Sequence, residues 1–230
     1  MAATSQGQVK IAVPDAGEVS ALWSYPENAR WMMVLAHGAG AGMRHPFLEK
    51  LAAELAGAGI ATFRYQFPYM EQRRRAPDSP PLLKSAVRAA VGAARETAPD
   101  LPILAGGKSM GGRMTSQAAS EDPPEFESVR GLVFFGFPLH PPGKPGIQRA
   151  EHLAHVKIPM LFLQGTRDQF ADLNLLRPVC SNLGTLATLH VIETADHSFH
   201  VLKSSGKTDA DVMRELVQTV RAWAETISAK

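Results

Sequence analysis

The chain has 230 residues, of which 45% are apolar and 20% charged, and its formal net charge is +2 at pH 7. These values are typical of a soluble globular protein with one substantial core, and so small a charge gives no sign of a nucleic-acid partner. No apolar run suits a signal peptide or a membrane-spanning helix, and the lone cysteine, Cys180, excludes an internal disulfide. We expect one cytoplasmic domain over residues 1–230, with no membrane partner; the oligomeric state stays open.

Apolar strand-like runs alternate with helical segments along the chain. The expected strands cover residues 9–13, 19–25, 32–36, 60–65, 101–106, 131–137, 160–164 and 186–193. Apolar residues with helical spacing fall at 48–55, 83–91 and 212–227, and a further helix is expected after residue 109. This alternation predicts an α/β fold with a mostly parallel central sheet and helices on both faces. No insertion is long enough for a large cap domain.

An irregular segment over residues 136–149 interrupts this pattern. It holds four prolines and three glycines, which oppose regular structure. Because it follows the carboxyl end of a strand, it is placed where ligands bind in open α/β sheets. A stiff surface connection, a pocket wall and a lid all remain open as its role.

The most informative stretch is Gly-Lys-Ser-Met-Gly at 107–111, which has the form G-x-S-x-G. A predicted strand precedes it and a predicted helix follows it, which is the context of a nucleophile elbow that exposes the hydroxyl of Ser109. With 19 glycines in the chain, a chance match is the alternative. A phosphate-binding loop ending in Gly-Lys-Ser is excluded, because that motif needs glycine where this chain has Pro102.

Two further residues complete the predicted catalytic set. Asp168 and His197 each follow a predicted strand, and the chain order of serine, acid and histidine is the one this elbow motif uses. His197 would take the proton of Ser109, and Asp168 would orient the imidazole ring. Asp196 and Asp172 are rival acids, for which we expect roles in shaping a loop and in capping a helix.

An oxyanion site needs two backbone N–H groups near the serine. One is expected from Met110, the residue after the serine, and the other from Ala39 in the glycine-rich segment 37–42. We expect His37 to hold that segment in place. Candidate substrate contacts, chosen by position, share a place in the loops around the predicted serine: Gly38, Gly40, Tyr69, Met70, Leu139, His140 and Phe199.

Other patterns carry less chemistry. His152 and His155 lack the intervening pattern of a zinc site, so no metal and no cofactor is expected. Three arginines at 73–75 form a short basic run that is either a solvated surface or a contact for an anionic substrate or nucleic acid.

These segments resemble the α/β-hydrolase superfamily over nearly the whole chain. The resemblance rests on residues 37–42, 107–113, 164–168 and 196–199, and on Pro-Leu-His-Pro-Pro-Gly-Lys-Pro at 138–145. The last of these is similar to a dienelactone-hydrolase-like branch of small predicted hydrolases, which includes the hydrolase-like domain of a eukaryotic chromatin-complex subunit. Dienelactone hydrolases proper use a cysteine where this chain has Ser109, so the resemblance does not imply their substrate.

The sequence therefore predicts a serine hydrolase that cleaves a carboxylic ester or related acyl bond in a small molecule through an acyl-enzyme. Ester, thioester, lactone and peptide bonds remain open as the substrate bond. The alternative is an interaction module that keeps the fold without turnover.

Overall fold

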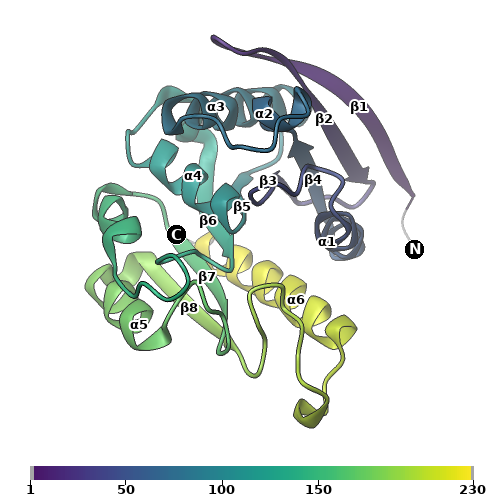
Figure 1. Cartoon of the computed structure of the whole chain (residues 1–230). Helices are drawn as coiled ribbons and strands as arrows, with labels where there is room; N and C mark the ends of the chain where they lie inside the picture. Colours follow the sequence, from purple (N-terminus) through teal and green to yellow (C-terminus); the bar gives the residue numbers. More distant parts are fainter. Residues whose placement is uncertain (1–2, 229–230) are drawn as a thin grey trace.

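The computed structural model describes residues 3–228 of the chain, and one eight-stranded sheet runs through it (Figure 1). The strands lie in the order β1-β2-β4-β3-β5-β6-β7-β8. The pairs β1–β2 and β2–β4 are antiparallel, and every other pair is parallel. The strands are β1 (Thr4–Val13), β2 (Gly17–Pro26), β3 (Trp31–Ala36), β4 (Ile60–Tyr65), β5 (Ile103–Lys108), β6 (Val129–Phe135), β7 (Met160–Gly165) and β8 (Ala187–Ile192).

Helices cover both faces of this sheet (Figure 1). The α-helices are α1 (Pro46–Gly57), α2 (Pro68–Glu71), α3 (Pro80–Thr97), α4 (Met110–Ala119), α5 (Leu173–Asn182) and α6 (Asp209–Ser228). Side chains of α3, α4 and α5 build a core on one face, and side chains of α1 and α6 build a core on the other. Four short 3-10 helices are η1 (Pro124–Ser128), η2 (Gln148–His155), η3 (Gly184–Leu186) and η4 (Lys203–Ser205).

The two cores follow from the two-residue period of the strands. In β3, Met32 and Val34 belong to the core under α3 and α4, whereas Met33 and Leu35 belong to the core under α1 and α6. All four side chains are buried, which is why this strand is a continuous apolar run rather than an alternating one. The sequence pattern of a strand covered on both faces is thus confirmed.

The predicted elements agree with the observed ones, with three differences. Strand β1 begins at Thr4 rather than at residue 9, because its polar first half pairs with β2 at the edge of the sheet. Helix α2 has only four residues, and α5 contains Pro178, which breaks the expected helical pattern. Helix α2 was not predicted, and of α5 only the cap at Asp172 was expected. The mostly parallel sheet, the helices on both faces and the lack of a large cap are as predicted.

The carboxyl ends of the parallel strands share one edge of the sheet. The loops after β3, β5, β7 and β8 therefore meet there, and these loops carry the candidate site residues. Within residues 3–228 no helix is both long and apolar enough to cross a membrane.

Candidate active site

Ser109 stands at a sharp turn between β5 and α4. Its backbone has φ 52° and ψ −119°, a conformation that non-glycine residues rarely adopt. The flanking glycines permit close backbone contacts: a Cβ on Gly107 would lie 2.2 Å from the carbonyl oxygen of Ala36, and one on Gly111 would lie 2.5 Å from the same atom. The end of β3 thus packs directly against the turn, as the predicted elbow requires.

The hydroxyl of Ser109 faces a histidine from the far end of the sheet. Its Oγ lies 2.9 Å from Nε2 of His197, whose Nδ1 lies 2.6 Å from Oδ2 of Asp168. The Asp168 side chain has no solvent exposure, whereas the His197 side chain is 19% exposed. The three predicted residues therefore form one hydrogen-bonded chain that runs from a buried carboxylate to the accessible edge of the sheet.

The carboxylate of Asp168 is held by further donors. Gln164 donates a hydrogen bond from Nε2 to Oδ2 over 2.5 Å, and the backbone N–H of Phe170 donates to Oδ1 over 2.8 Å. The Phe170 ring also packs against the imidazole of His197, with 4.4 Å between the ring centroids. These contacts fix both the carboxylate and the ring, and the sequence alone did not point to Gln164 or Phe170.

Glycine also brings the acid loop and the histidine loop together. A Cβ on Gly165 would lie 2.3 Å from the carbonyl oxygen of Ala195, and the N–H of Arg167 donates to that same oxygen over 2.9 Å. The rival acid Asp196 accepts hydrogen bonds from the N–H groups of Ser198 and His200. Its predicted role in shaping the loop is confirmed.

His37 holds the glycine-rich loop after β3 in place through two hydrogen bonds. This ring is buried; Nδ1 donates to the carbonyl oxygen of Gly38 over 2.7 Å, and Nε2 accepts from the N–H of Phe67 over 3.1 Å. Burial lowers the pKa of His37 to about 4, although the hydrogen bond to Gly38 opposes this. His37 is thus neutral at pH 7, and its predicted structural role is confirmed.

Tyr69 braces the same loop from α2. Its hydroxyl oxygen accepts a hydrogen bond from the N–H of Gly40 over 2.9 Å, and its side chain is buried. Among the hydrogen bonds of residues 3–228, none uses the N–H of Ala39 or of Met110 as a donor. Two N–H groups are thus left for another acceptor, on the two loops predicted to supply the oxyanion site.

A cavity of about 400 Å³ opens beside Ser109 and His197. Its remaining lining residues come from the loop after β3, the start of α1 and the loops after β5, β7 and β8: Gly38, Ala39, Ala41, His45, Phe47, Leu48, Lys108, Phe170 and Ser198. Most of this wall is apolar, and its only basic side chains are His45, Lys108 and His197. The sequence did not point to His45 and Phe47, which lie before and at the start of α1.

The predicted substrate contacts divide into two groups. Gly38 lines the cavity; Gly40, Tyr69, Met70, Leu139, His140 and Phe199 do not. Phe199 instead stacks on Phe47, with 5.8 Å between the ring centroids. Leu139 and Phe199 are buried. Direct contact of these residues with a substrate stays a prediction.

His140 ties the irregular segment to the loop that carries Asp168. Its Nδ1 donates to the carbonyl oxygen of Pro141 over 2.9 Å, and its Nε2 accepts from the N–H of Asp172 over 3.0 Å. Asp172 itself caps the first turn of α5 by accepting from the N–H of Asn174, as predicted. These two hydrogen bonds of the His140 ring anchor the segment, whereas a lid would need freedom to move.

The arginine run at 73–75 does not line the cavity. Arg74 pairs with Asp78 and also bonds Gln72.

In the part of the chain that the structure describes, no group of three or more histidine, cysteine or acidic side chains could hold a metal ion.

Comparison with known proteins assigns the fold. Residues 29–225 match a family described as an alpha/beta hydrolase domain. The chain belongs to this family. The match spans every element from β3 into α6, including the loops that carry Ser109, Asp168 and His197.

Solved structures of several hydrolases are similar to this chain over almost their full length. A dienelactone hydrolase from Anabaena variabilis is 23% identical with a TM-score of 0.73, and 96% of each chain is covered. A lidless α/β serine hydrolase from Xanthomonas campestris is 19% identical with a TM-score of 0.75, and 95% of each chain is covered. An esterase domain from Rhodothermus marinus is 15% identical with a TM-score of 0.70, covering 96% of this chain and 98% of that one. Because all three identities are low, this structural similarity is evidence for the fold alone.

Proposed function

We propose that this alpha/beta hydrolase is a serine esterase that cleaves a carboxylic ester in a small molecule. The observation that carries the proposal is the chain of hydrogen bonds from Asp168 through His197 to Ser109, at 2.6 and 2.9 Å, beside an open cavity. A histidine between a buried carboxylate and a serine hydroxyl can accept the hydroxyl proton and stabilise the resulting imidazolium. The serine hydrolase and the esterase among the similar structures support the same activity.

The reaction would proceed in two stages. Oγ of Ser109 attacks the ester carbonyl carbon while Nε2 of His197 takes the hydroxyl proton, and the carbonyl electrons move onto an oxyanion that accepts hydrogen bonds from the N–H groups of Ala39 and Met110. The intermediate collapses, the alkoxide leaves with the proton of His197, and the acyl group stays on Ser109. Water then attacks this acyl-enzyme, gives its proton to His197, and releases the acid as the proton returns to Oγ.

The cavity favours a compact acyl or alcohol group. Ala41, Phe47, Leu48 and Phe170 provide apolar contact beside the serine, and a volume of about 400 Å³ suits a short aliphatic or a single aromatic group. We expect p-nitrophenyl esters of short acids to be cleaved faster than esters of long-chain acids.

The proposal is tested by Ser109→Ala. We expect this variant to remain folded and to lose p-nitrophenyl ester hydrolysis by about a thousandfold or more, because no other group replaces the attacking oxygen. The measurement is kcat/KM over a series of acyl-chain lengths, together with labelling by a fluorophosphonate probe and mapping of the labelled residue.

Full hydrolysis by Ser109→Ala would refute the proposal. A folded wild-type protein that neither hydrolyses the esters nor is labelled at Ser109 would favour the alternative of an interaction module without turnover.

A further inference from the structure

Lys108 is the residue before the predicted nucleophile. Its terminal amino group is buried and has no role in the reaction proposed above. Its Nζ atom is shielded from solvent and has no hydrogen-bond partner. Its chain lines the cavity, and Nζ lies over the ring of Phe199, 5.6 Å from the centroid. Charged groups buried without a hydrogen bond are costly, so their retention is characteristic of functional sites.

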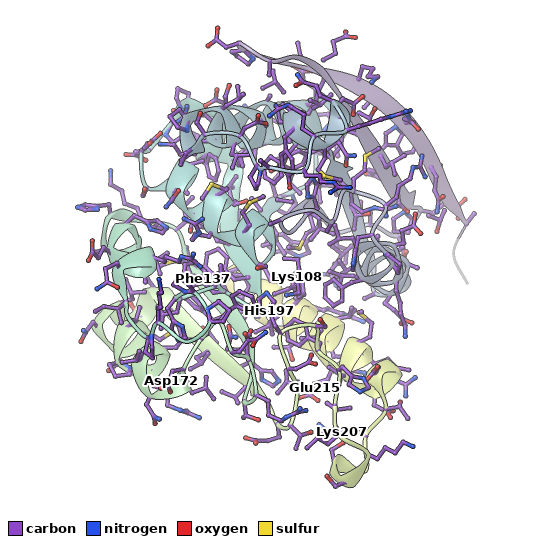
Figure 2. The ribbon with its side chains drawn as sticks, in the orientation of Figure 1. Lys108, Phe137, Asp172, His197, Lys207 and Glu215 are labelled. Carbon is purple, nitrogen blue, oxygen red and sulfur yellow. The ribbon has the colours of Figure 1, made fainter. Side chains whose placement is uncertain are left out.

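The ammonium group lies beside the acid–histidine pair. A Cβ built on Gly136 would lie 3.1 Å from Nζ of Lys108, 3.3 Å from Nδ1 of His197 and 3.4 Å from Oδ2 of Asp168. These three atoms therefore surround one point, and Gly136, at φ 71°, leaves that point without a side chain. Figure 2 shows the labelled side chains of Lys108 and His197 next to each other near the centre of the molecule.

Two carboxylates interact with the buried ammonium group. Asp168 and Asp196 both attract the ammonium group of Lys108, but burial outweighs them and lowers its pKa to about 8. Lys108 thus carries its charge at neutral and acidic pH. His45 is a further basic side chain of the cavity wall.

We propose that Lys108 is a positioning residue for the reaction under "Proposed function", on which this inference rests: its ammonium group keeps Asp168 ionised and opposes protonation of His197. A neighbouring positive charge disfavours the imidazolium form. The ring of His197 is therefore held as a free base, able to accept the proton of Ser109, at a lower pH than the carboxylate alone would permit. The lysine acts through the histidine and touches no reacting atom.

The first test replaces Lys108 by methionine, which keeps the length of the side chain and removes its charge. We expect Lys108→Met to move the acidic limb of the pH profile of kcat/KM upward by about one unit. Activity at pH 5.5 relative to pH 8 should then fall about tenfold against wild type. The thermal unfolding temperature is measured alongside, so that an effect on folding is separated from the shift of the pH profile.

Lys157→Met is the matched control, because the side chain of Lys157 is 74% exposed and pairs with Asp122 at the surface. Its pH profile should match that of the wild type. An acidic limb that stays in place in Lys108→Met would overturn the inference, as would a loss of stability with an unchanged pH profile.

A second measurement does not depend on turnover. In an NMR titration of the His197 ring in wild-type protein, assigned by comparison with His197→Gln, we expect a small second inflection near pH 8 as Lys108 loses its proton. In Lys108→Met that inflection should vanish and the main midpoint should rise by about one unit. A wild-type ring signal without an inflection near pH 8 would contradict the inference. If the titration is as expected but no ester is hydrolysed, the proposed function is refuted instead.

Discussion

His37 and His197 both follow strands at the same edge of the sheet, and their ring nitrogens meet different partners. Both nitrogens of His37 bond backbone groups, and the ring has no solvent exposure. One nitrogen of His197 bonds a carboxylate and the other a hydroxyl, and its side chain is 19% exposed. Backbone partners fix a tautomer and hold a loop, whereas an acid and a hydroxyl allow a proton to move.

His140 belongs with His37 in this comparison. Its ring also donates to one backbone carbonyl and accepts from one backbone N–H, and it lies buried between two loops. The proposed base, His197, therefore differs from His37 and His140 in the partners of its ring nitrogens. Its place at the sheet edge does not distinguish it from them.

The largest expected effect is a loss of activity on replacing His197, the histidine that bonds an acid and a hydroxyl. His197→Gln should lower kcat for p-nitrophenyl esters by about 10⁵- to 10⁶-fold, because Ser109 loses its base. The unfolding temperature should change little, since the ring is partly exposed. His155→Gln, a change on the exposed end of η2, is the control and should keep wild-type kinetics. Substantial ester hydrolysis by folded His197→Gln would place the base elsewhere.

The next effect concerns stability and pH. The pKa of His37 is lowered from 6.5 to about 4 by burial, so between these values the unfolded chain binds the proton and the folded protein does not. The stabilising contribution is complete above pH 6.5 and is lost as the pH falls toward 4. In urea unfolding, wild type should lose about 2 kcal/mol more than His37→Gln between pH 7.5 and 4.5.

Part of the pH dependence should persist in His37→Gln. The pKa of His152 is also lowered to about 4, first by burial and then by Arg113, so this residue adds its own contribution over the same range. Equal losses in wild type and His37→Gln would show that burial does not lower the pKa of His37 in the folded protein.

The smallest effect tests the brace beneath the glycine-rich loop. Tyr69→Phe leaves the N–H of Gly40 without its acceptor, which should lower the free energy of unfolding by about 1–2 kcal/mol. We expect kcat to fall by roughly tenfold, because the neighbouring N–H of Ala39 is held less firmly toward an oxyanion. Chemical denaturation and ester kinetics measure the two effects. Tyr25→Phe, on β2, is the matched control, and an equal loss of activity there would contradict this role of Tyr69.

The sequence was sufficient to predict the sheet and the convergence of Ser109, Asp168 and His197. Ser109 and Asp168 follow buried apolar strands and His197 follows the partly buried edge strand β8; parallel strands end at one edge, so the convergence of these residues requires no knowledge of packing. The extent of helix α5 beyond its cap at Asp172 was missed because Pro178 interrupts the pattern, and α2 was missed because one turn has no periodicity.

The surroundings of the site could not be predicted in the same way. The ring of Phe170 on His197 and the buried ammonium of Lys108 depend on how loops distant in the sequence pack. Lys108 occupies the variable position of G-x-S-x-G, so the motif itself assigns it no role. For Tyr69 the sequence indicated the neighbourhood of the site, but not that its hydroxyl bonds Gly40.

Helix α6 also determines when the protein can finish folding during synthesis. It packs with α1 over one face of the sheet (Figure 1), and its Trp223 lies so close to β6 that a Cβ on Gly131 would be 2.6 Å from the indole ring. The opposite core uses residues up to Cys180 and is complete earlier on the ribosome. A nascent chain therefore exposes apolar residues of this sheet face until α6 has emerged, and surface of this kind is prone to aggregation.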